Sequence, residues 1–171
     1  MLSEAARKTP EMIAYLGPIL TGDQCEPIVR QVPVAFLDVL WPDVVDLLGA
    51  VAERSSGRLD IKAIAGAIIS GGWQLWVIWD GRIRCVLATE ITVEATGQKN
   101  ARIVLATGNG ASQWVNLIGD IEEWARSEGC RYLEMTARKG WARYLKAYRM
   151  THVLLERDLQ QTASTVDEID E

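Results

Sequence analysis

The chain has 171 residues, of which 49% are hydrophobic and 24% charged, a length and balance that fit one globular domain with a sizeable core. Its formal net charge of −5 argues against general nucleic-acid binding, which needs a basic surface. No apolar segment reaches about 18 residues without a charge, so no membrane span is predicted.

The N-terminal segment is interrupted by prolines. Residues 1–27 predict an irregular arm with one short helix near Glu11–Leu16. Residues 28–36 predict the first strand, in which Pro33 marks an edge or a bulge because proline cannot donate to a central ladder. We therefore expect the folded domain to begin at residue 28.

Two helices are predicted next. Trp41-Pro42 opens the first, since proline fits the first turn of a helix, and residues 55–57 (Ser-Ser-Gly) end it. The second runs from about Asp60 to Ser70, where isoleucines recur at helical spacing, and stops at Gly71-Gly72.

Three consecutive strands form the next predicted unit. Trp73–Trp79 is an apolar run typical of a strand covered on both faces. Asp80-Gly81 is a strong hairpin signal, and Arg82–Glu94 is the long return strand. A turn at Ala95–Gln98 leads to the third strand, Ala101–Thr107, so this region predicts an antiparallel meander.

An amphipathic helix is predicted from Ser112 to about Ser127. Its apolar residues fall on a single face and are Trp114, Leu117, Ile118, Ile121 and Ala125. Ser112 is a suitable N-cap, and Gly129 is a suitable stop.

The last third continues with a strand at 131–136 and a short helix whose spaced apolar residues are Trp141, Tyr144, Leu145 and Tyr148. Thr151–Arg157 predicts a closing strand, and the polar, acidic residues 160–171 predict a solvated tail. The domain proper is expected over 28–159. Its order, β-α-α-β-β-β-α-β-α-β, predicts an α/β or α+β fold with a mixed central sheet flanked by helices.

A glycine turn connects the third meander strand to the helix at Ser112. Gly108 and Gly110 permit close backbone approach to an anion, and the free N–H groups at a helix N-terminus favour phosphate. A plain tight turn is the alternative. Six basic residues against one acidic residue between Arg131 and Arg149 offer a surface for an anionic ligand, or simply a solvated helix face.

Three dispersed cysteines and the single histidine, His152, predict neither a disulfide framework nor a metal site. No apolar run follows the charges of residues 1–8, so no secretory signal is expected and the thiols are expected to be reduced.

The segment Arg102–Arg157 resembles the GNAT superfamily of acetyl-CoA-dependent N-acyltransferases. Its junction "WARSEGCRYLEM" matches the family's passage from helix to strand, and the resemblance extends over residues 28–158. The stretch "RKGWARYLKAYRMTHVLLERDL" is similar to GNAT-like proteins of bacteriophages and prophages. The resemblance implies acetyl-CoA as acyl donor and a small-molecule or protein amine as acceptor. The similarity to phage proteins implies a place in a bacterial cytoplasm or in a phage virion, where we expect a protein partner or a homo-oligomer.

The resemblance also implies roles for particular residues. The pyrophosphate loop would consist of Gly108, Asn109, Gly110, Ala111 and Ser112, and the backbone N–H of Leu105 or Ala106 would polarise the thioester carbonyl.

Proton transfer needs an acid and a base. Glu90, in the long strand, is the candidate base that accepts the proton of the attacking ammonium. Its alternatives are exposure to solvent or pairing with Arg102 on the neighbouring strand. Tyr144 or Tyr148 would protonate the departing thiolate.

Departures from the family pattern, together with the tryptophan-rich helices, favour a second hypothesis. The loop lacks the usual Arg or Gln ahead of its glycines, Lys146 stands at the usual tyrosine spacing, and Arg149-Met150 replaces the conventional Gly-Phe. A degenerate active site would make the chain a non-catalytic GNAT-like scaffold, such as a phage virion, internal-core or assembly component. A third hypothesis is a regulatory protein that docks through its N-terminal arm.

Overall fold

The computed structural model describes residues 26–108, 115–137 and 139–152. The chain divides into two compact units, residues 1–138 and 139–171. The predicted helix near Glu11–Leu16 and the predicted tail at 160–171 lie outside the described residues.

One five-stranded sheet organises the first unit, in the order β1-β2-β3-β4-β5. The strands are β1 (Ile28–Val32), β2 (Trp73–Trp79), β3 (Ile83–Val93), β4 (Lys99–Gly108) and β5 (Tyr132–Met135). Neighbours among the first four strands are antiparallel, whereas β5 runs parallel to β4. The predicted mixed sheet and meander are confirmed.

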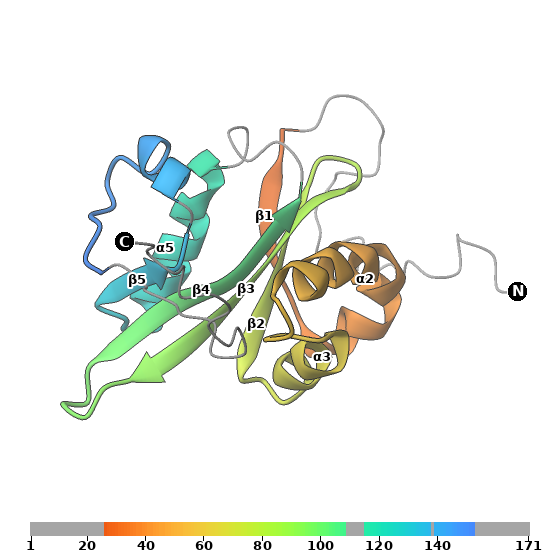
Figure 1. Ribbon diagram of the computed structural model, residues 1–171, viewed down its shortest axis with the longest axis horizontal. Coiled ribbons are helices and arrows are strands. Elements are labelled where there is room, and N and C mark those ends of the chain that lie inside the picture. The colour runs from red at the N-terminus through yellow and green to blue at the C-terminus, as the bar shows by residue number, and fades with distance from the viewer. Residues whose placement is uncertain (1–25, 109–114, 138, 153–171) are drawn as a thin grey trace, which may run out of the picture. The chain divides into compact units, whose positions relative to one another are not determined.

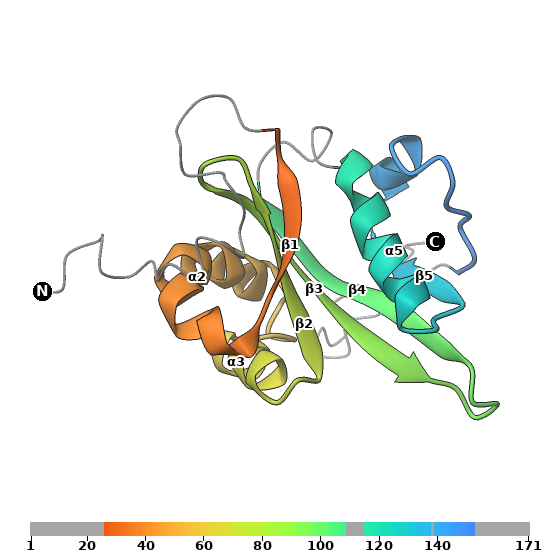
Figure 2. The same ribbon diagram turned by 180° about the vertical axis from the view of Figure 1, so that it is seen from behind.

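Helices cover both faces of this sheet (Figures 1 and 2). Helices α2 (Leu37–Arg54) and α3 (Ile61–Ile69) lie on one face, and α5 (Ile118–Ser127) lies on the other. The core under α2 and α3 consists of apolar side chains, among them Leu40, Val44, Leu48, Ile64, Ile68, Leu75, Val77, Val86, Ala88 and Leu105. On the opposite face the rings of Trp76 and Trp124 meet edge-on, with centroids 5.1 Å apart.

The first helix begins earlier than the sequence predicted. Strand β1 ends at Val32, Pro33 precedes a 3-10 turn η3 (Val34–Phe36), and α2 starts at Leu37 rather than at Trp41-Pro42. Pro42 therefore lies inside α2, where its missing N–H weakens the helix. Burial of Leu37 and Leu40, 4% and 2% exposed, offsets this cost by about 1.5–3 kcal/mol for each side chain.

A bulge in β4 places neighbouring residues on opposite faces. Ala88 pairs with Leu105, but Thr89 pairs with Ile103, so Val104 is an extra residue. Cross-strand partners share a face, so Leu105 joins the α2–α3 core while Ile103 lies with Thr89 on the α5 face. Both side chains are 5% exposed, so the bulge lets one strand fill both cores.

The second unit is less helical than predicted. Its 3-10 helix η5 (Lys139–Arg143) ends before Tyr144, and only turns follow up to Tyr148. A short helix needs its apolar face buried, and Tyr144 is 43% exposed. Thr151 and His152 are not in a strand, and the rest of the predicted closing strand lies outside the described residues.

Candidate functional site

Strand β4 extends beyond the end of its parallel partner, β5. Pairing with β5 ends at Ile103 and Met135, yet β4 continues from Val104 to Gly108. Within the described residues, β3 is the only strand beside this stretch. Successive N–H and C=O groups of a strand point to opposite edges, so alternate groups of β4 here face the side that β5 has left. The predicted thioester-polarising residues, Leu105 and Ala106, both lie in this stretch.

Gly108 closes the strand in a conformation reserved for glycine. Its φ is +144°, and a Cβ there would lie 2.7 Å from the Cα of Cys85 on β3. The lack of a side chain at Gly108 therefore allows the end of β4 to pair closely with Cys85 of β3. The remaining residues of the predicted pyrophosphate loop, Asn109, Gly110, Ala111 and Ser112, lie outside the described residues.

The helix beyond that loop has a mixed start. Its first described turn is the 3-10 helix η4 (Val115–Leu117), and the α-helical part α5 begins only at Ile118. The prediction of α-helix at 115–117 was therefore wrong, since a tighter 3-10 turn forms the entry, as is common at helix termini. Predicted apolar positions Ile118, Ile121 and Ala125 are buried as expected.

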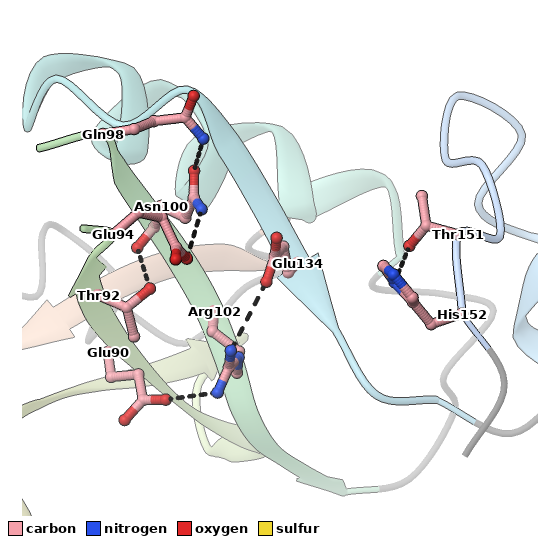
Figure 3. A network of polar contacts seen from close by, with 9 residues as sticks. All are labelled: Glu90, Thr92, Glu94, Gln98, Asn100, Arg102, Glu134, Thr151 and His152. Carbon is pink, nitrogen blue, oxygen red and sulfur yellow. Dashed lines mark hydrogen bonds and ion pairs between the residues drawn. The ribbon is translucent and has the colours of Figure 1, made fainter. Parts of the chain in front are cut away.

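A row of four side chains crosses the sheet at the point where β4 and β5 stop pairing. Trp73 of β2 pairs with Glu90 of β3, Glu90 with Arg102 of β4, and Arg102 with Glu134 of β5. Cross-strand partners share a face, and Trp73 packs against the α2–α3 core, so this transverse row lies on the α2–α3 face. Figure 3 shows its three charged members.

Both carboxylate oxygens of Glu90 accept hydrogen bonds from neighbouring strands. Arg102 Nη1 donates to Oε1 at 3.2 Å, and Trp73 Nε1 donates to Oε2 at 3.2 Å. The other Arg102 amino group, Nη2, lies 3.8 Å from Glu134 Oε2. The Glu90 side chain is 25% exposed, against 44% for Arg102 and 45% for Glu134, so Glu90 is the more enclosed carboxylate. Of the alternatives for Glu90, pairing with Arg102 is the one observed.

A second polar cluster fixes the hairpin beyond Glu90 (Figure 3). Asn100 is buried, its amide donates to Glu94 Oε1 at 3.3 Å, and its oxygen accepts from Gln98 Nε2 at 3.0 Å. Thr92 Oγ1 donates to the Asn100 backbone oxygen at 3.4 Å. These contacts lie at the end of β3 that is away from the divergence, so Glu90 is nearer to the divergence than Glu94.

The residues next to Gly108 include two that sequence reasoning did not single out. Arg54, the last residue of α2, donates from Nη2 to Thr107 Oγ1 at 3.2 Å. Burial raises the pKa of the Cys85 thiol from 9.0 to about 12, so this thiol stays protonated near neutral pH and is no nucleophile. No spacing in the sequence links Arg54 to Thr107, because they lie on different elements.

The candidate tyrosines belong to the second unit. Tyr144 lies beside Arg143, whose guanidinium carbon is 5.5 Å from the ring centroid. Tyr148 donates its backbone N–H to the oxygen of Leu145. His152 is exposed and contacts the hydroxyl of Thr151 through Nδ1 at 3.0 Å.

Neither a metal site nor a membrane-spanning helix is found in the described part of the chain. No group of three or more His, Cys, Asp or Glu side chains is arranged there to hold a metal ion. None of the helices in those ranges is both long and apolar enough to cross a membrane.

Comparison with solved structures places the fold among acetyltransferases. The chain is similar to an aminoglycoside acetyltransferase from an uncultured soil metagenomic sample, with a TM-score of 0.59 and 12% identity over 78% of this chain and 97% of that one. It is also similar to an acetyltransferase of Trypanosoma brucei, with a TM-score of 0.55 and 19% identity over 78% and 99% of the two chains.

A third similar structure is the glucosamine-6-phosphate N-acetyltransferase of Arabidopsis thaliana, with a TM-score of 0.57 and 11% identity over 78% of this chain and 98% of that one. No protein-family model matches the chain, and no curated protein sequence does. At these identities the likeness concerns the fold, which is that of the GNAT acetyltransferases.

Proposed function

We propose that this protein is an N-acetyltransferase that uses acetyl-CoA to acylate an amine. The observation that carries the proposal is the divergence of β4 from β5 after Ile103. It leaves a strand edge from Val104 to Gly108 that leads toward the predicted phosphate loop and α5. The similar solved acetyltransferases support the same assignment.

The proposed cofactor site combines this edge with the glycine loop. The backbone from Leu105 to Ala106 supplies an N–H to the thioester oxygen, where negative charge develops during attack. Gly108, Asn109, Gly110, Ala111 and Ser112 surround the pyrophosphate, which the N–H groups at a helix start favour. Arg54, beside Thr107, adds a cation near the entrance of this loop.

The proposed reaction moves one acetyl group. The acceptor ammonium gives a proton to Glu90, directly or through a water, and the freed nitrogen lone pair forms the bond to the carbonyl carbon. The carbon–sulfur bond breaks, and Tyr144 or Tyr148 donates a proton to the sulfur. The nitrogen then releases its remaining surplus proton to solvent, and the proton on Glu90 returns through solvent to the tyrosinate. The products are therefore the acetamide, CoA and one proton.

The acceptor amine is to be identified by testing a panel of candidate amines. The names of the similar structures refer to an aminoglycoside and to glucosamine 6-phosphate as acceptors of those enzymes. A panel that holds one of each, a polyamine and a lysine-containing peptide therefore covers cationic, phosphorylated and peptidic amines. Release of the CoA thiol reports turnover with each.

The alternative is a non-catalytic GNAT-like scaffold in a phage assembly. The observation that favours it is the engagement of Glu90 by both Arg102 and Trp73, as expected of a purely structural ion pair. Calorimetric titration separates the two. The enzyme proposal predicts micromolar binding of acetyl-CoA, whereas absence of binding by the folded protein would favour the scaffold.

A further inference from the structure

The Glu90 carboxylate is oriented by donors on both neighbouring strands. Arg102 holds Oε1 from β4 and Trp73 holds Oε2 from β2, each at 3.2 Å. Each carboxylate oxygen carries two lone pairs, so two of about four acceptor positions are used and the others are available for a proton. The two contacts therefore restrict the direction of the carboxylate and leave acceptor positions on its oxygens for a proton.

The two donors differ in how firmly they are fixed. Arg102 is 44% exposed and is shared with Glu134, so its ion pair with Glu90 is a surface contact of small and variable strength. Trp73 is half-buried and packs against the α2–α3 core, which locks its ring in place. The indole N–H is thus the donor that gives the Glu90 carboxylate a fixed orientation.

We propose that Trp73 is a positioning residue, which aims Glu90 at the acceptor amine at the point where β4 and β5 diverge. This inference rests on the proposed acetyl transfer. The position of the transverse row supports this role. Arg102 and Glu134 pair one residue before the last β4–β5 pair, which is Ile103 with Met135. An oriented base needs such rigid support, because a displacement of about 1 Å can cost about a hundredfold in rate.

The choice of nucleophile tests this role. An alkylamine is a cation at neutral pH and needs a base, whereas hydroxylamine is largely unprotonated there and needs none. Transfer from acetyl-CoA to both is measured for the wild type, Trp73→Phe and Glu90→Gln. The alkylamine used in this test is the amine of the panel described above that the wild type acetylates fastest.

We expect Trp73→Phe to slow transfer to the alkylamine about tenfold and Glu90→Gln to slow it about a hundredfold. Hydroxylamine transfer and the Kd of acetyl-CoA should change by less than about twofold, since neither depends on the base. A purely structural role would slow both nucleophiles together or neither, and either pattern would overturn the inference.

Trp76→Phe is the matched control. It also removes an indole N–H from β2, but that group donates to Thr89 Oγ1 at 2.9 Å on the α5 face. Thr89 keeps its contact with Gln74, so this variant should transfer to both nucleophiles at the wild-type rate. If Trp73→Phe does not fold, Arg102→Gln gives the complementary test. Because Trp73 still orients Glu90 there, transfer to the alkylamine should fall by less than about twofold, and a larger selective fall would overturn the assignment to Trp73.

The remaining outcomes separate the two proposals. No binding of acetyl-CoA by the folded wild type would overturn the proposed function itself. Binding without transfer to either nucleophile would overturn the positioning role, because the oriented base would then serve no reaction.

Discussion

The Cα of Cys85 lies 2.7 Å from the point where a side chain at Gly108 would begin. Glycine at 108 is therefore required by the close approach of β3 and by its own φ of +144°. The predicted phosphate loop follows Gly108, so the position of the β4 end before this loop depends on the close approach of the two strands.

Gly108→Ala should destabilise the protein by about 2–4 kcal/mol, since it adds a backbone clash to an unfavourable φ. The change is measured as the free energy of unfolding in urea. Gly119→Ala is the matched control. A Cβ at residue 119 of α5 meets nothing within 4 Å, so this variant should be more stable by up to about 1 kcal/mol. Equal effects of the two substitutions would contradict the contact.

Asp60 caps α3 through Oδ1, which accepts from the backbone N–H of Ala63 at 2.7 Å. Asp60→Ala should lower the free energy of unfolding by about 1 kcal/mol, whereas Asp60→Ser, which retains a capping oxygen, should lose only part of that. Thermal unfolding of the wild type and both variants measures these losses. Loss of the same amount in each would mean that the side-chain cap contributes nothing.

Pro42 lies in α2 although its nitrogen has no proton for the helix ladder. Pro42→Ala restores a hydrogen-bond donor toward Asp38 and relieves the ring's crowding of that turn, so we expect a gain of about 1–2 kcal/mol. Urea unfolding measures it. A loss of stability would show that packing of the proline ring outweighs the missing hydrogen bond.

The buried Cys85 thiol predicts a loss of stability at alkaline pH. Burial raises its pKa from 9.0 to about 12, so above pH 9 the unfolded chain releases this proton first. Stability is then lost progressively between about pH 9 and 12, by up to about 4 kcal/mol at the upper end. Unfolding of the wild type and Cys85→Ala is compared across this range. Parallel pH profiles would contradict the assignment.

The elements were predictable where hydrophobic period and turn residues agree. Trp73–Trp79 is confirmed at both ends as β2, and the helix predicted from about Asp60 to Ser70 is confirmed as α3, Ile61–Ile69. The start of α2 was missed because Pro42 suggested a first turn, whereas burial of Leu37 and Leu40 extends the helix back through it. Tertiary packing decided that boundary, and local preference did not.

The site was predictable only in part, because strand register depends on bulges. A two-residue turn at Asp80-Gly81 would set Trp73 opposite Ala88, but a three-residue turn and an extra residue at Arg84 set it opposite Glu90. The pairing of Glu90 with Arg102 was among the alternatives drawn from the sequence. The Trp73 contact could not be found from the sequence, since nothing in the pattern marks a bulge at Arg84.

The proposed function depends on binding of the acetyl-CoA pyrophosphate by the glycine loop after β4. Its most direct test is calorimetric titration of the wild type, Gly110→Val and the control Gly119→Ala with acetyl-CoA. A β-branched side chain at residue 110 blocks close approach of an anion to the backbone and resists positive φ. We expect micromolar binding by the wild type and by Gly119→Ala, and no binding by folded Gly110→Val. Unchanged affinity in that variant, or no binding by the wild type, would contradict it.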